Sequence, residues 1–182
     1  MIRQMELGDV PRVAEIQVFA WRTSDRGIIS DEYLFRDMTV VKRIDYYKNL
    51  LINCTDENYV FDDGIIKAFI TISKCKDEDM PDSPQLSSIY VEPFFQRNGI
   101  GSQMIKYFED IALQRGFSRV CLWVMKKNDN AISFYEKLGY APDGTEFTGG
   151  LGTTEIRYIK MLCFNSSSPL SSPARHNNPP RL

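Results

Sequence analysis

Histidine is almost absent from this sequence: the only one among its 182 residues is His176, which lies in a polar C-terminal segment. A Ser-His-Asp or Cys-His catalytic device in the body of the chain is therefore excluded, because each needs an imidazole as its base. Cysteine is also scarce. The four cysteines are too far apart for a paired zinc-ligand pattern or a disulfide framework, so no metal site is predicted: Cys54, Cys75, Cys121 and Cys163.

Long apolar runs and an excess of one charge are missing too. The longest apolar stretch, residues 64–73, contains Lys67 and is far too short to span a bilayer. Twenty-two Lys and Arg residues against 24 Asp and Glu residues give a net charge of -2, which argues against nucleic acid as the main partner. The first residues show no secretory pattern. We therefore expect a cytoplasmic enzyme or binding domain with no membrane contact.

The chain length and composition fit one globular domain, with 43% hydrophobic and 25% charged residues. We place this domain at residues 1–164. Residues 165–182 form a separate tail with five Ser, four Pro and three Asn residues, which cannot bury enough apolar surface to fold alone. The tail is compatible with vector-derived sequence. If it is ordered, we expect a groove or a neighbouring chain to hold it.

Hydrophobic periodicity predicts an α/β fold. Strands are predicted from alternating or continuous apolar runs at residues 2–6, 58–61, 65–73, 86–91, 120–125 and 154–164. Helices are predicted at residues 9–26, 32–51, 101–115 and 131–138, with Asp31 capping the second and Asn130 the fourth. The order β-α-α-β-β-β-α-β-α-β implies a central mixed sheet with helices on both faces.

The most informative segment runs from Ser88 to Ser102, where a strand leads into a glycine-containing loop at the start of a long helix. The first N–H groups of a helix are unpaired and lie at the positive end of its dipole, so they bind phosphate oxygens. Gly99 and Gly101 lack the side chains that would keep a pyrophosphate from the backbone, and Arg97 adds a positive charge. The loop alone is equally compatible with a tight turn whose glycines serve packing.

Two common phosphate loops fit this segment poorly. A Walker loop needs Lys and then Ser or Thr after its last glycine, but Gly101 is followed by Ser102 and Gln103. A dinucleotide fingerprint needs a small residue at position 104, which is Met104, and an acidic residue where Met125 ends the next strand.

The segment Gln96-Arg97-Asn98-Gly99-Ile100-Gly101 resembles the Gln/Arg-x-x-Gly-x-Gly/Ala motif of the GNAT superfamily of acetyl-CoA-dependent N-acyltransferases. Residues 89–93 resemble that family's strand with its proline exit, and residues 128–140 resemble its Asn-x-x-Ala-x-x-x-Tyr-Glu-Lys-x-Gly-Phe segment. The resemblance is strong over residues 86–140 and follows the element order over residues 1–164. It implies a GNAT-like, mostly antiparallel sheet and transfer of acetyl from acetyl-CoA to a primary amine of a small molecule or protein by direct attack in a ternary complex.

The resemblance also implies the cofactor contacts. The parallel strands 86–91 and 120–125 should splay apart, so that backbone groups of Ile89 and Val91 bond the pantetheine arm. Tyr90 between them is also expected to bind the cofactor. The thioester would lie in the gap, and Asn128 would contact the arm unless it serves only as a turn or helix cap. The pyrophosphate would bind the N–H groups of Gln96, Arg97, Asn98, Gly99, Ile100, Gly101 and Ser102.

Tyr135 matches the family's proton donor to the departing thiolate. A phenol with a pKa of about 10 is protonated at neutral pH and can donate; the alternative is a core tyrosine whose hydroxyl merely finds a partner. The strand 86–91 contains no carboxylate. Glu92, Asp25 and Glu32 could reach the amine through water, but each is more typical of a solvated surface charge. No general base is assigned.

The acceptor should be recognised by residues 20–35 and by the turn 144–153. Pocket walls are predicted at Trp21, Tyr33, Phe35 and Phe147, and a cationic amine would be attracted by Asp25, Asp31 and Glu32. Two other classes stay open, a coenzyme A-binding regulatory module without turnover and a nucleotide-binding protein. A homodimer through the last strands is what the family resemblance implies.

Overall fold

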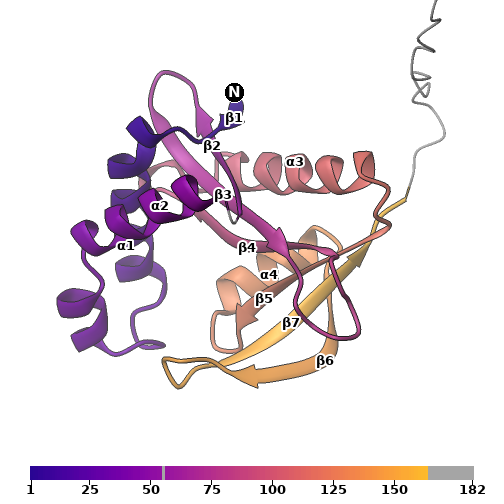
Figure 1. Ribbon diagram of the computed structural model, residues 1–182. Coiled ribbons are helices and arrows are strands. Elements are labelled where there is room, and N and C mark those ends of the chain that lie inside the picture. Colours follow the sequence, from indigo (N-terminus) through magenta and orange to yellow (C-terminus); the bar gives the residue numbers. More distant parts are fainter. Residues whose placement is uncertain (55, 164–182) are drawn as a thin grey trace, which may run out of the picture.

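The computed structural model describes residues 1–54 and 56–163 and contains one seven-stranded sheet in the order β1-β2-β3-β4-β5-β7-β6 (Figure 1). Its strands are β1 Ile2–Gln4, β2 Glu57–Asp62, β3 Ile66–Lys74, β4 Pro84–Val91, β5 Arg119–Met125, β6 Ala141–Thr148 and β7 Thr154–Met161. The α-helices are α1 Val10–Ser24, α2 Val40–Asn53, α3 Ile100–Gln114 and α4 Asp129–Lys137. Every strand pair is antiparallel except β4 with β5, so the mixed, mostly antiparallel α/β fold is confirmed.

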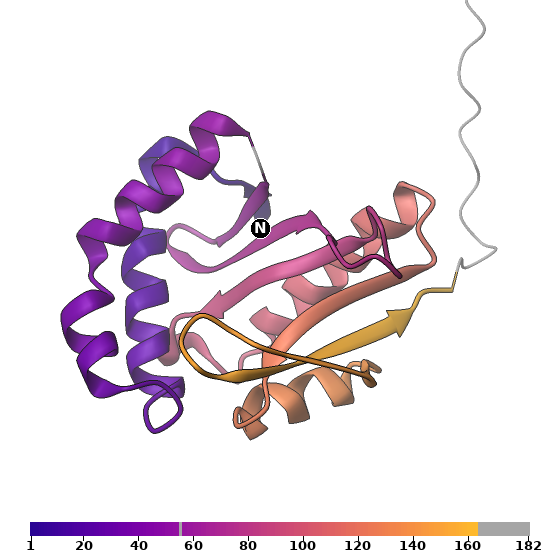
Figure 2. The same ribbon diagram turned by 60° about the horizontal axis from the view of Figure 1, so that its bottom comes forward.

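Helices cover both faces of the sheet because successive strand residues point to opposite sides. Ala68 and Ile70 of β3 belong to the large core shared with α3 and α4, whereas Phe69 between them packs with α1 and α2 in a second core. The helix α3 buries its apolar residues at the predicted spacing, among them Met104 and Phe108. Figure 2 shows α1 and α2 together on one side of the sheet.

The two parallel strands separate soon after they meet. Only Gln85 and Leu86 of β4 pair with β5, opposite Cys121 and Leu122. The β3–β4 register shifts at this level, where Thr71 opposes Ser88 and Ile72 opposes Leu86, so Ser87 is the extra residue of a bulge. Beyond the bulge β4 stays with β3. The predicted splay is therefore present, and it leaves a gap between the carboxyl-terminal parts of β4 and β5.

The helix predicted over residues 32–51 is wrong in its extent, and Asp31 does not cap α2. Tyr33–Asp37 is a short π-helical segment, and α2 begins at Val40 after its N-cap Thr39, whose side chain accepts from Lys42 N at 3.3 Å. Arg22 of α1 explains the break. Its guanidinium donates to the carbonyls of Leu34 (3.0 Å) and Met38 (3.2 Å), which a continuous helix would use itself.

The strand β6 was not predicted, because it lies at the sheet edge with all eight residues exposed and so carries no apolar pattern. The turn expected at residues 144–153 is correspondingly shorter, since β6 runs to Thr148. The last strand ends at Met161 rather than at residue 164. The prediction about the tail concerns residues 165–182, which lie outside the described residues. No helix within residues 1–54 or 56–163 is long and apolar enough to cross a membrane.

Candidate active site

The candidate site lies at the carboxyl-terminal ends of β4 and β5, where the gap opens. The chain leaves β4 through the loop that begins α3, and it leaves β5 through the turn that begins α4. Because the two strands are parallel, both helix starts lie at the same end of the sheet. The sequence-predicted cofactor and donor residues are thus brought to one edge of the molecule.

The backbone of β4 has one free side along this gap. Glu92 N–H donates to the Lys67 carbonyl of β3 at 2.8 Å, so alternation along an antiparallel ladder turns the backbone groups of Val91 and Ile89 away from β3. The Val91 carbonyl accepts from Gln96 Nε2 at 3.1 Å. An extended ligand could therefore pair with β4 at both residues, and at Val91 it would compete with the Gln96 side chain.

Tyr90 lies differently from its two neighbours. Its backbone is in register with Phe69 of β3, and its ring packs on Phe69 at 5.3 Å between centroids, on the side of α1. The Tyr90 hydroxyl accepts from Trp21 Nε1 at 2.7 Å. A cofactor contact through the Tyr90 backbone is thus not available on the gap side, and only its side chain could reach a bound ligand.

The loop before α3 presents its backbone to solvent. Arg97 and Gly99 both have positive φ, 64° and 76°, and residues Gln96 to Gly99 are exposed. Gly99 offers no side-chain cap, and the Gln103 N–H is the first to reach a helix carbonyl, that of Gly99 at 3.1 Å. The amides of residues 100–102 precede this first bond, so together with Arg97 they suit a diphosphate.

Gly101 has a packing role. A Cβ there would lie 3.1 Å from Phe134 Cζ of α4, so a glycine lets α3 begin close against α4. Ile100 beside it is buried in the large core and anchors the start of the helix. Each of the two interpretations of the glycines thus applies to one residue. Gly99 gives the exposed loop its left-handed backbone, as a phosphate-binding loop requires, and Gly101 allows close packing of α3 on α4.

Tyr135 points from α4 into the large core and is 8% exposed. Burial raises the pKa of its phenol above the ordinary value, and the nearby Tyr90 raises it further, so the group is protonated at neutral pH. In the described chain the only side-chain oxygen or nitrogen that is both sealed and unpartnered is Tyr140 Oη. Tyr135 Oη, which takes part in no hydrogen bond there, therefore borders space that solvent reaches.

Asn128 connects the two sides of the site. Its Oδ1 accepts from Ala131 N at 3.0 Å and caps α4, so the prediction of Asn130 as the cap is wrong. Its Nδ2 donates to Asp25 Oδ1 at the end of α1, at 3.3 Å. The cap leaves the second role of Asn128, a contact to a cofactor, as a prediction.

The three carboxylates considered from the sequence occupy very different surroundings. Glu92 pairs with Arg12, and Glu32 is exposed beside Arg36 at 2.9 Å. Asp25 is 4% exposed, so its interpretation as a solvated surface charge is wrong. Burial raises the pKa of Asp25 to about 6, against a smaller opposite effect of its hydrogen bond from Ser24. No local signal in the sequence marks this burial, since Asp25 stands between Ser24 and Arg26.

Of the predicted acceptor walls, Trp21 and Tyr33 lie together, with ring centroids 6.2 Å apart. The ring of Phe147 packs on Trp123 with 4.8 Å between their centroids. Phe35 is half exposed and lies beside the guanidinium of Arg22. A shallow hollow of about 550 Å³ is lined by residues 26–31, directly after Asp25.

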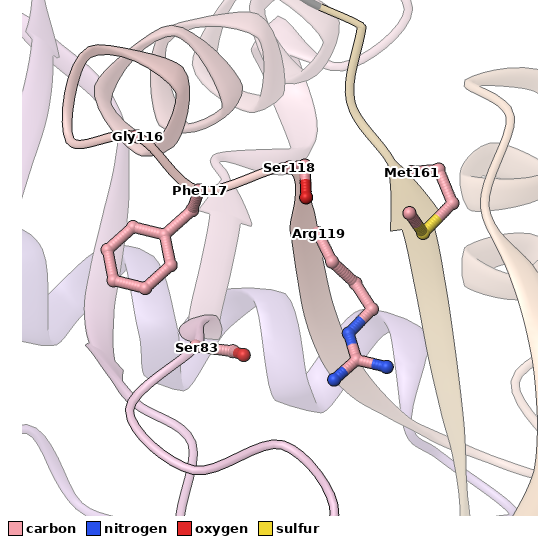
Figure 3. A pocket seen from close by; sticks show the side chains of 6 residues that line it. All are labelled: Ser83, Gly116, Phe117, Ser118, Arg119 and Met161. Carbon is pink, nitrogen blue, oxygen red and sulfur yellow. The ribbon is translucent and has the colours of Figure 1, made fainter.

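A second hollow, of about 340 Å³, lies away from this site at the amino-terminal end of β5 (Figure 3). Figure 3 shows Arg119 between Phe117 and Met161. The Arg119 guanidinium donates to the backbone carbonyl of Asp79 at 3.2 Å and so binds the loop between β3 and β4. This hollow is not part of the candidate active site.

A mixed sheet that opens between its two parallel strands, beside a helix start suited to a diphosphate, has the architecture of an acyltransferase. Residues 16–140 match the acetyltransferase (GNAT) family, and the chain belongs to this family. It is 31% identical over 173 residues to the probable N-acetyltransferase Rv2775 of Mycobacterium tuberculosis, covering 92% of this chain and 95% of that protein. The family predicted from the motifs is thus confirmed.

Two further comparisons agree. The chain is 26% identical over 173 residues to the uncharacterized N-acetyltransferase YuaI of Bacillus subtilis, covering 88% of this chain and 96% of that protein. Among solved structures, the PaiA N-acetyltransferase from Thermoplasma acidophilum in complex with coenzyme A superimposes with a TM-score of 0.70 at 20% identity, covering 89% of this chain and 98% of that one. At this identity the likeness concerns the fold.

Proposed function

We propose that this protein transfers the acetyl group of acetyl-CoA to a primary amine by direct attack in a ternary complex. The observation that carries the proposal is the gap between β4 and β5, where backbone groups of Ile89 and Val91 have no neighbouring strand and only the Val91 carbonyl has a partner, the Gln96 side chain. The complex of the PaiA N-acetyltransferase with coenzyme A supports this choice of cofactor.

Different residues of the site bind different parts of the cofactor. The backbone of Ile89 and Val91 pairs with the extended pantetheine arm of acetyl-CoA, which takes the place of a neighbouring strand. Asn128 lies at the far side of the gap. The N–H groups of residues 97–102 hold the diphosphate, with Arg97 adding its charge. The Gln96 N–H, predicted to join them, donates to the Pro93 carbonyl at 3.3 Å. When bound, acetyl-CoA supplies the thioester whose acetyl group is transferred.

Tyr135 supplies the proton that the departing sulfur needs. Its phenol is protonated at neutral pH, is held by core packing and has no competing hydrogen-bond partner among residues 1–54 and 56–163. A donor kept this way is available throughout the physiological pH range, because its raised pKa prevents loss of the proton to solvent.

The acceptor enters from the side of α1. Trp21 and Tyr33 form an aromatic wall there, and Asp25 supplies a carboxylate beside it. An amine that is protonated in solution fits these groups, since aromatic faces and carboxylates both attract cations.

The test is a panel of primary amines, from polyamines to peptides with free N-termini, assayed for thiol release from acetyl-CoA. Coenzyme A binding is measured in parallel by calorimetry. Release of thiol that depends on both acetyl-CoA and one amine class supports the proposal. Coenzyme A binding without turnover on any amine would favour the regulatory module, and binding of ATP or NAD without coenzyme A would favour a nucleotide-binding protein.

A further inference from the structure

Asp25 is the one acidic residue in the described part of the chain whose side chain is buried. Its backbone is held on both sides: its N–H donates to the Trp21 carbonyl at 3.0 Å, and its carbonyl accepts from Ile28 N and Ile29 N at 3.0 and 2.9 Å. The carboxylate therefore has a set position at the end of α1 rather than the mobility of a surface acid.

The two carboxylate oxygens differ in their contacts. Oδ1 accepts from Ser24 Oγ at 3.0 Å and from Asn128 Nδ2 at 3.3 Å. Oδ2 accepts from no group in residues 1–54 and 56–163, and it is not among the sealed, unpartnered atoms, so it faces space that solvent reaches. One oxygen anchors the group while the other is free to meet a ligand.

The groups around the carboxylate do not neutralise it. Ser24 of α1, Tyr90 of β4 and Asn128 before α4 are neutral polar groups at pH 7. The following residue, Arg26, reaches Asp31 at 3.5 Å instead. By contrast, the buried Arg157 is paired with three carboxylates. A buried acid without a cation is unfavourable for folding, and such groups concentrate at functional sites.

Asp25 also adjoins the transfer site. Asn128, which binds it, caps the helix that carries Tyr135. The Tyr90 phenol lies near both Asp25 and Tyr135. Trp21 lies one helical turn before Asp25 and so on the same side of α1. Carboxylate, aromatic wall and phenol are thus linked through Asn128 and Tyr90.

We propose that Asp25 is the catalytic residue that receives the acceptor: its Oδ2 binds the ammonium group of a cationic primary amine and takes one proton from it. This inference rests on the proposed function. The amine nitrogen, now neutral, forms the bond to the acetyl carbonyl carbon as the carbon–sulfur bond breaks. The Tyr135 phenol gives its proton to the sulfur and regains one from the nitrogen. The proton on Asp25 leaves to solvent, so the products are the amide, the thiol and one proton.

The test compares Asp25→Asn with Asp45→Asn, which changes an exposed aspartate on α2. For the best amine of the panel, kcat/KM is measured from pH 5 to pH 9, with coenzyme A affinity by calorimetry and folding by circular dichroism. The wild type and Asp45→Asn should share a limb that rises with pH near 6. Asp25→Asn should lose that limb and about 100-fold or more of kcat/KM at pH 7, with its coenzyme A affinity changed by about 2-fold or less.

A second variant keeps the test decisive if the asparagine protein does not fold. In Asp25→Ala, added formate can take the place of the missing carboxylate, and it should restore activity in a dose-dependent way. Full activity of Asp25→Asn with an unchanged pH profile, or no effect of formate on an inactive Asp25→Ala, overturns the role of Asp25 while the acetyltransferase stands. A wild type that binds coenzyme A and acetylates no amine overturns both.

Discussion

The variant Asp25→Asn is expected to be more stable than the wild type at neutral pH, although it removes the carboxylate that we assign to catalysis. The carboxyl has a pKa of about 6 in the folded protein and an ordinary value of 3.8. At roughly 1.4 kcal/mol for each pH unit, this difference means that ionised Asp25 lowers the free energy of unfolding by about 3 kcal/mol at pH 7. Asparagine is neutral and keeps an acceptor oxygen for Ser24 and Asn128, so it avoids this cost.

The sign of the pH dependence follows from the same two values. Below about pH 4 the carboxyl is protonated in both the folded and the unfolded wild type, and the two proteins should be similarly stable. Between about pH 4 and pH 6 the unfolded chain ionises first, so the wild type loses stability relative to the variant. Above about pH 7 the difference should level off at up to about 3 kcal/mol, or several degrees in melting temperature.

The assay is urea denaturation followed by circular dichroism from pH 4 to pH 8, with Asp45→Asn as the control for removal of one negative charge. An asparagine variant that is less stable than the wild type at pH 7 would refute the reasoning, and so would a stability difference that does not change with pH. A purely structural aspartate should give that first result, because its loss removes favourable contacts.

Other predictions test the rest of the site. Tyr135→Phe should lower kcat by about 100-fold or more without weakening coenzyme A binding, whereas Tyr46→Phe on α2 should leave kcat unchanged; equal activities would reject the donor role. Arg97→Ala should weaken coenzyme A binding several-fold at low salt and less at high salt, because salt screens an exposed charge, and Lys106→Ala is the matched control in calorimetry. Gly101→Val should lower the free energy of unfolding by about 1–3 kcal/mol through overpacking against Phe134, measured by urea denaturation beside Gly8→Val, which has open space; equal losses would contradict it. Arg157→Met should lower the free energy of unfolding by roughly 1–3 kcal/mol in the same assay, because it removes the buried guanidinium that donates to Asp77, Asp79 and Asp143; an unchanged midpoint would show that these ion pairs contribute little.

The sequence predicts most of the sheet and the helix α3, because these elements carry their apolar residues at regular spacing. It also predicts the position of the loop at Gly99, since its motif is local. It could not predict β6, whose exposed residues have no pattern, or the break before Val40, which depends on Arg22 from another helix. The burial of Asp25 escaped for the same reason: it depends on Asn128, 103 positions away.

The short β4–β5 ladder gives two leucines an importance that their position in the core does not suggest. Leu86 and Leu122 face each other in the last pair before the strands part, and both belong to the large core. Strands β1 to β4 are joined to strands β5 to β7 by backbone pairing only at Gln85 and Leu86. The two parts of the sheet are therefore held together largely by side-chain packing. The gap between β4 and β5 thus ends at an apolar contact. Replacing either leucine by alanine would lengthen the gap and also weaken the packing between the two parts of the sheet, β1 to β4 and β5 to β7.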